Sequence, residues 1–160
     1  MVNSFPQFSL SNHFIADQLK IARLETNTDW DHYNSQRHNP LQVKICDKTT
    51  SKCCDTYLYY YFAYGKHDWF DNIPVGNCTL GDGFQIFKNH TIEATIYNHM
   101  PIYTGNDWKW LGKSLDILTK TDANEARESD VLTCPISNWL NMYKSMKLTC
   151  EWKGNSNNTL

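Results

Sequence analysis

Leu41-Gln-Val-Lys-Ile45 alternates apolar and polar residues, which is the period of a strand with one face buried and the other in water. After a turn-rich stretch from Asp47 to Asp55, the run Thr56-Tyr-Leu-Tyr-Tyr-Tyr-Phe-Ala63 places bulky side chains on both faces of a second strand. These two strands predict stacked β-sheets, because both faces of the aromatic strand need to be covered.

Short segments of the same kind recur along the chain and are separated by turn residues such as Asp82-Gly83. The sequence predicts eight strands, at residues 41–45, 56–63, 69–73, 84–87, 91–97, 108–117, 131–134 and 146–152. Short strands with turns between them are typical of an all-β, antiparallel eight-stranded β-sandwich, which buries one face of each sheet. We expect the aromatic side chains of Phe84, Trp108 and Trp139 to anchor its core. Residues 137–147 fit either a helix capped by Ser137 or a loop.

Residues 1–40 differ from the strand region. Ile15, Leu19 and Ala22 are spaced i, i+4 and i+7, which predicts a short helix over residues 13–24 outside the sandwich. A polar stretch that ends at Pro40 then predicts a linker. We therefore expect an N-terminal extension at 1–40, the sandwich at 41–153 and a disordered tail at 154–160.

Composition excludes several classes of protein. The chain has 160 residues, which fits one domain, and its net charge of -2 gives no electrostatic case for nucleic acid. No apolar run approaches the roughly 20 residues that span a bilayer, so no transmembrane segment is expected. The first ten residues lack a basic region and an apolar run, so no signal peptide is predicted.

The six cysteines make an even set, at Cys46, Cys53, Cys54, Cys78, Cys134 and Cys150. Three disulfides are the favoured interpretation, although reduced buried thiols are an alternative and zinc fits the spacing poorly. Disulfides would place the chain in an oxidising, extracellular compartment, so we predict a secreted protein. Asn-x-Ser/Thr motifs make Asn77 and Asn89 candidate glycosylation sites, and a third motif begins at Asn157.

No catalytic motif is present: the sequence has no nucleophile elbow, metalloprotease helix motif, phosphate loop or dinucleotide fingerprint. The six histidines are scattered, mostly in expected loops, at His13, His32, His38, His67, His90 and His99. We therefore expect no enzyme and no cofactor, with a small hydrolase as a remaining alternative. Trp69-Phe70, at an expected hairpin, is the best candidate for an exposed apolar tip that enters a lipid interface, although burial of the pair is the interpretation that the residues alone favour.

Several motifs in order resemble the PLAT domain, the β-sandwich found in lipoxygenases, including its cysteine-containing embryo-specific plant type. The matching stretches are Leu41-Gln-Val-Lys-Ile-Cys-Asp47 with Cys54-Asp-Thr-Tyr-Leu58, Trp69-Phe-Asp-Asn72, Gly81-Asp-Gly-Phe84, Gly105-Asn-Asp-Trp-Lys-Trp110 running on to Leu115-Asp-Ile117, and Leu132-Thr-Cys-Pro-Ile-Ser-Asn-Trp-Leu140. The resemblance implies an eight-stranded sandwich that binds a lipid surface or a protein partner and has no chemistry of its own.

The resemblance also implies which residues make contacts. It points to a rim of loops around Trp69, Phe70, Asp55 and Asp82, with Asp55 and Asp82 as candidate calcium ligands. From the residues alone, ordinary turn chemistry is the favoured interpretation of these aspartates, and calcium is the alternative. In such a sandwich the loops that hold Cys78 and Cys53 or Cys54 lie at one end, so Cys78 is expected to pair with one of these two. We expect a monomer. The alternative function is a host-directed secreted effector or toxin that uses the sandwich as a protein-recognition scaffold.

Overall fold

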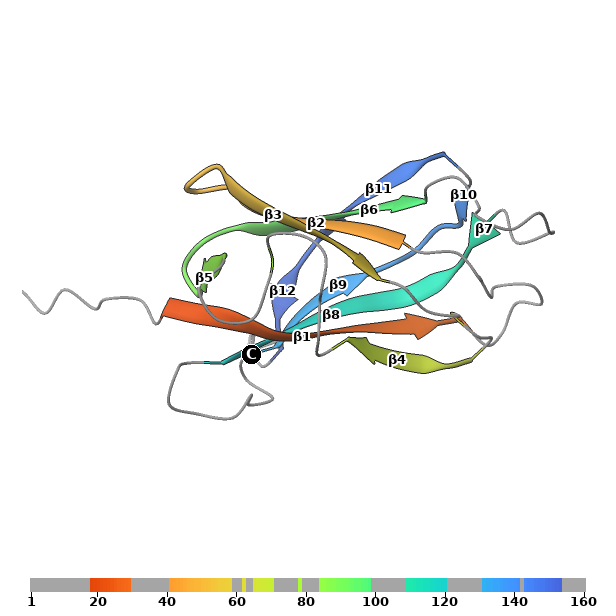
Figure 1. Cartoon of the computed structure of the whole chain (residues 1–160), viewed down its shortest axis with the longest axis horizontal. Coiled ribbons are helices and arrows are strands. Elements are labelled where there is room, and N and C mark those ends of the chain that lie inside the picture. The colour runs from red at the N-terminus through yellow and green to blue at the C-terminus, as the bar shows by residue number, and fades with distance from the viewer. Residues whose placement is uncertain are drawn as a thin grey trace, which may run out of the picture.

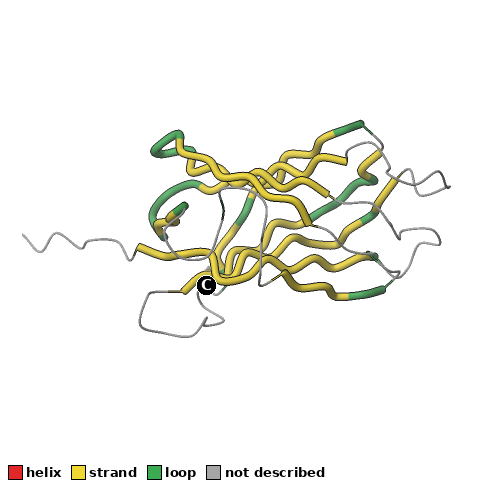
Figure 2. The backbone as a smooth tube through the Cα atoms, in the orientation of Figure 1, coloured by secondary structure: helices red, strands yellow, loops and turns green. Residues whose placement is uncertain are grey.

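All regular elements of the described chain are strands, as Figure 2 shows. The structure is a computed structural model, and it describes residues 18–29, 41–58, 62, 65–70, 78, 84–98, 109–120, 131–141 and 143–153. The strands are β1 (Gln18–Thr28), β2 (Leu41–Asp47), β3 (Lys52–Leu58), β4 (His67–Phe70), β5 (Gln85–Phe87), β6 (Ile92–Asn98), β7 (Lys109–Trp110), β8 (Gly112–Lys120), β9 (Val131–Pro135), β10 (Leu140–Asn141), β11 (Ser145–Thr149) and β12 (Glu151–Trp152). The prediction of an all-β chain is confirmed.

Two antiparallel sheets lie face to face and form the sandwich (Figure 1). The larger, six-stranded sheet has the order β12-β9-β8-β1-β4, and β5 pairs with the N-terminal part of β1. The smaller, four-stranded sheet has the order β11-β6-β2-β3. The short pair β7 and β10 lies at the end of the sandwich where β2 begins.

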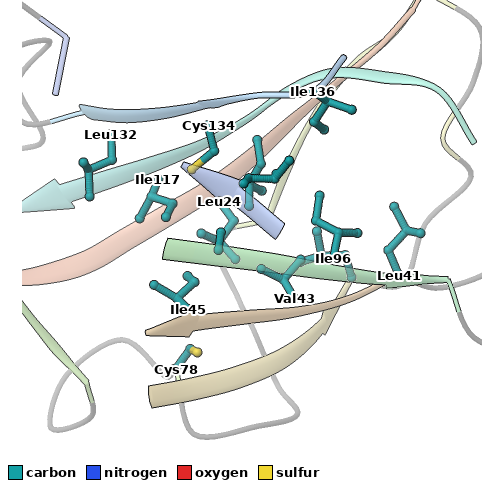
Figure 3. Packing of buried hydrophobic residues seen from close by; sticks show 14 of the residues in the cluster. Leu24, Leu41, Val43, Ile45, Cys78, Ile96, Ile117, Leu132, Cys134 and Ile136 are labelled. Carbon is teal, nitrogen blue, oxygen red and sulfur yellow. The ribbon is translucent and has the colours of Figure 1, made fainter. Parts of the chain in front are cut away.

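The core fills the space between the two sheets (Figure 3). Leu24, Ile117 and Leu132 point inward from the larger sheet. Val43 and Ile96 point toward them from the smaller sheet, and all five side chains are fully or almost fully buried. Burying an aliphatic side chain of this size contributes about 1.5–3 kcal/mol, so this layer is the main source of stability.

The expected helix over residues 13–24 is wrong over its described part, because β1 begins at Gln18 and lies between β8 and β4 in the larger sheet. Its register against β8 skips Ala22, which forms a β-bulge. The bulge shifts the inward positions from Leu19 and Ile21 to Leu24, and the resulting mixture of two- and three-residue spacings imitates a helix. Residues 18–28 are therefore part of the sandwich and not of an extension outside it.

The expected number of eight strands is also wrong, since the described residues form twelve. The predicted strand at 108–117 divides at Leu111 into β7 and β8. The predicted strand at 146–152 divides at Cys150, where the chain leaves the smaller sheet and enters the larger one. The segment 137–147, for which helix and loop stayed open, contains β10, a turn and the start of β11.

The aromatic anchors differ in part from the expectation. Trp110, on β7, is completely buried and donates from its indole Nε1 to Thr28 Oγ1 at 3.1 Å. Phe84 packs partly buried against the core, whereas Trp139 is only half-buried and the next residue, Leu140, takes the inward position. Trp108 lies outside the described residues. Strand alternation explains the difference, because neighbouring residues of an extended chain face opposite ways.

Three disulfides are present, which confirms the favoured interpretation of the cysteines. Cys46 pairs with Cys53, Cys54 with Cys78, and Cys134 with Cys150. The partner of Cys78 is thus one of the two expected residues. Cys134–Cys150 ties β9 of the larger sheet to the point where the chain changes sheets, and Cys46–Cys53 joins directly opposite residues of β2 and β3. The Cys134–Cys150 bridge therefore resists separation of the two sheets.

Candidate binding surface

Trp69 lies in β4, which is paired only with β1 among the described strands. His67 and Trp69 point away from the core, while Asp68 and Phe70 point toward it. The Trp69 side chain is 60% exposed, and Phe70 packs against the buried Phe62 with ring centroids 6.0 Å apart. The two neighbouring aromatic residues therefore have opposite environments, and of the two only the Trp69 side chain is largely exposed to solvent.

Polar side chains lie next to the exposed indole. The Arg23 guanidinium lies 6.0 Å from the centre of the Trp69 ring, and the His67 ring meets it edge-on at 6.0 Å. Glu25, directly opposite Trp69, holds both neighbours: its Oε2 lies 2.7 Å from His67 Nε2 and its Oε1 lies 3.5 Å from the Arg23 guanidinium. We call these four residues the Trp69 surface. At these distances a cation above the ring and an edge-on ring contact each favour this orientation of the indole.

Two more cations lie on the same outer face of the larger sheet. Lys20 and Lys120 are directly opposite each other in β1 and β8. Both alternate with inward residues, so both point outward together with Arg23. The two ammonium groups repel each other, which disfavours the pairing of β1 with β8 at this position. A bound anion would reduce this repulsion, so the part of the face around Lys20 and Lys120 is a candidate contact for negatively charged groups.

A buried carboxyl group lies beside Glu25 on the outer face. Asp116, opposite Glu25 in β8, is only 7% exposed, and its Oδ1 has no hydrogen-bond partner. Burial raises the pKa of Asp116, and the Glu25 carboxylate adds to the increase, although Thr133 and Lys153 oppose it. The ionised form of Asp116 therefore lowers the stability of the fold.

A second acidic site joins two turns at one end of the sandwich. Asp47 Oδ1 accepts from the backbone N–H groups of Thr49 and Thr50 at 2.8 and 3.1 Å, and its Oδ2 lies 2.6 Å from His90 Nδ1. Burial opposes ionisation of Asp47, but together the hydrogen bonds from His90, Thr50 and Thr49 outweigh it and lower the pKa. Sequence reasoning missed this pair, whose members are 43 residues apart. The turn motif Asp47-Lys-Thr-Thr50 was its only local signal.

The predicted rim residues do not all lie together. Asp55 points outward from β3, on the face of the smaller sheet that is turned away from Trp69, and its cross-strand neighbour is Lys44. A neighbouring cation is unfavourable for a calcium ligand, so Asp55 by itself fits calcium poorly. Asp82 lies outside the described residues, and the calcium pair stays a prediction. In the part of the chain that the structure describes, no three His, Cys, Asp or Glu side chains are grouped to hold a metal ion.

Of the two candidate glycosylation sites, one lies within the described residues. Asn89 is exposed in the turn between β5 and β6, a position that leaves room for a glycan, whereas Asn77 lies outside the described residues. Within the described ranges there is no helix long and apolar enough to cross a membrane.

Comparison with known proteins shows a likeness in fold without a likeness in sequence. No family model and no curated sequence matches the chain. Among solved structures, an engineered lipoxygenase (LOX) in complex with arachidonate matches with a TM-score of 0.54 at 14% identity, over 84% of this chain and 17% of that one. A second LOX variant gives 0.55 at 16% identity, over 84% and 16%. The alpha toxin from Clostridium absonum gives 0.51 at 10% identity, over 84% and 31%.

These matches define a PLAT-like β-sandwich, the kind of domain that lipoxygenase and alpha toxin each contain. The chain spans 17% of the first lipoxygenase and 31% of the toxin, so the likeness concerns one domain of each. At 10–16% identity it shows the fold alone. The resemblance to the plant type stays a prediction.

Proposed function

We propose that the chain is a non-catalytic, secreted binding module whose Trp69 surface docks on a lipid membrane. The observation that carries the proposal is the 60% exposure of Trp69 beside Arg23 on the outer face of the larger sheet. An indole ring suits the membrane–water boundary because its body is apolar and its N–H is polar. Lys20 and Lys120, on the same outer face, supply positive charge that attracts anionic headgroups, whereas the Arg23 guanidinium is already paired with Glu25.

The size of these contributions predicts weak and reversible binding. Withdrawing roughly 100–150 Å² of indole surface from water contributes about 3 kcal/mol. The two lysines add at most about 2 kcal/mol, at about 1 kcal/mol each near an anionic surface. The sum stays below the about 8 kcal/mol of a micromolar complex. Binding should therefore weaken strongly as salt increases.

The disulfides support the proposed location. Three bridges among six cysteines leave no free cysteine, as in chains that mature in an oxidising compartment. Secretion, modification of Asn89 and a monomeric state are parts of the proposal. Calcium binding by Asp55 and Asp82 stays a prediction, which the calcium and chelator samples of the flotation experiment test.

Liposome flotation tests the lipid proposal. The chain is mixed with anionic or neutral vesicles, with calcium or with a chelator, at low and at physiological salt. We expect flotation with anionic vesicles at low salt, and its loss for Trp69→Ala, because removing about 3 kcal/mol weakens binding about a hundredfold. Tyr143→Ala is the matched control, because Tyr143 is 62% exposed at a different part of the sandwich. No flotation under any condition, or equal loss in both variants, would refute lipid docking at the Trp69 surface.

A protein-recognition scaffold, as in a secreted effector or toxin, is the second candidate. The observation that favours it is the edge of the smaller sheet at β11, where no described strand pairs with the side facing away from β6.

A further inference from the structure

One edge of the smaller sheet is formed by β11, which pairs only with β6 among the described strands. Asn98 N–H donates to Lys144 C=O at 2.9 Å, so the main-chain groups of Lys144 point toward β6. Because these directions alternate along a strand, residues 146 and 148 also bond to β6. The N–H and C=O groups of Ser145, Lys147 and Thr149 point to the open side, where the described chain provides no partner for them.

A groove follows this open edge. It has a volume of about 350 Å³ and is lined by Pro135, Ser137 and Asn138, by the strand from Met146 to Thr149, and by Glu151. This volume is at the lower end of the range for ligand sites, about 300–1,000 Å³. The groove is therefore large enough for a few residues of an extended chain.

The chemistry of the edge specifies its occupant. Main-chain donors and acceptors that recur at every second residue are matched by another extended backbone, which adds to the sheet as a further strand. Lys147 is exposed on the outer face, whereas Met146 and Leu148 face the inner side. A complementary strand places an acidic side chain opposite Lys147 and apolar side chains on either side of it.

A second copy of this chain is a poorer occupant. The antiparallel register that uses all five residues of β11 on both sides would set Lys147 directly opposite Lys147 of the other copy. Like charges at opposite positions are destabilising, and an edge lysine is a common device against self-pairing.

We propose that β11 and its groove bind an extended acidic segment of a protein partner by strand addition. This site is distinct from the Trp69 surface, because β11 belongs to the smaller sheet and Trp69 lies on the outer face of the larger one. The inference therefore goes beyond lipid docking, and either proposal can fail without the other.

The probes are two fluorescent, end-blocked peptides built on the core Thr-Val-Glu-Val-Thr, one with the central Glu and one with Lys in its place. Anisotropy measures affinity, and backbone amide NMR locates the contact. We expect the acidic peptide to bind at least about tenfold more tightly. Its central Glu places an opposite charge across from Lys147, whereas the Lys peptide places a like charge there. The amide signals of Ser145, Lys147 and Thr149 should shift most.

Two variants test the mechanism. Lys147→Pro removes only an N–H that points away from β6, so it should preserve the fold and reduce affinity at least about tenfold. Lys147→Glu should reverse the preference between the two peptides, and it remains informative if the proline variant is unstable. Lys44→Glu is the matched control, because Lys44 and Lys147 both lie opposite Thr95 in the same row of the sheet.

The possible outcomes separate the two sites. Binding by neither peptide, equal binding to Lys147→Pro, or amide shifts away from β11 would overturn the proposal. A concentration-dependent dimer that Lys147→Pro abolishes would replace the partner with a second copy. Trp69→Ala should leave peptide binding unchanged, and Lys147→Glu should float with vesicles to the same extent as Lys44→Glu.

Discussion

Replacing Gly112 by alanine should test the packing around the deepest aromatic residue. A Cβ at Gly112 would lie 2.3 Å from Trp110 Cη2, 2.6 Å from its Cζ2 and 2.8 Å from Ile136 Cδ1. Carbon atoms in contact are normally about 3.5–4.0 Å apart, so the indole would have to move by about 1 Å. Trp110 is held in place by its hydrogen bond to Thr28 and by the Phe62 ring, whose centroid is 5.8 Å away.

Overpacking a rigid core costs about 1–3 kcal/mol, and we expect Gly112→Ala to reach the upper end, about 3 kcal/mol. That is a large part of the about 5–15 kcal/mol that stabilises a typical domain. The assay is equilibrium unfolding in urea, followed by tryptophan fluorescence with the disulfides kept intact. The midpoint should fall while the slope stays the same.

A double-mutant cycle distinguishes this clash from a general effect of the alanine. Trp110→Phe removes the ring atoms that the new Cβ would meet, so Gly112→Ala should cost at least about 1 kcal/mol less in that background. A loss below about 1 kcal/mol for Gly112→Ala alone, or additive losses in the double variant, would refute the reasoning.

Three further predictions concern titration and cross-linking, each measured by urea unfolding. Because the folded-state pKa of Asp47 is lowered, its ionised form stabilises the fold above about pH 4. Asp47→Asn should therefore cost about 1–2 kcal/mol of unfolding free energy at pH 7. The cost should decrease progressively as the pH falls from about 5 to 2. A pH-independent loss would contradict the contribution of the charge. Because the folded-state pKa of Asp116 is raised, its ionised form destabilises the fold above about pH 4, so Asp116→Asn should stabilise the chain by about 1 kcal/mol at pH 7 and by nothing at pH 3. Destabilisation at pH 7 would show that the Asp116 charge has a partner. Replacing Cys134 and Cys150 together by alanine should cost about 3 kcal/mol, since the bridge closes a loop with a sequence separation of 16. A loss below about 1 kcal/mol would mean that packing alone holds the sheets together.

Local patterns in the sequence were sufficient for the class of fold. The alternation at residues 41–45 predicted a half-buried strand, and β2 has alternating buried and half-buried residues throughout. The even number of cysteines predicted three bridges, which are present. These properties follow from short-range geometry, because the period of a strand is a property of its own backbone.

The candidate surfaces depended on contacts between distant segments. Trp69 and Phe70 are equivalent in the sequence, but pairing of β4 with β1 turns one outward and the other into the core. The bulge at Ala22 hid β1 behind the spacing of a helix, since only the register against β8 reveals the extra residue.

The open edge at β11 likewise depends on which strand lies beside which. Its own five residues do not differ in kind from those of a central strand, and only the order β11-β6-β2-β3 leaves Lys147 at a boundary. The amino-acid pattern of one segment specifies its conformation and which of its faces is apolar, because both depend on neighbouring residues. Which faces and edges meet water depends on hydrogen bonds and packing between strands that are far apart in the chain, and only the assembled sandwich contains those contacts.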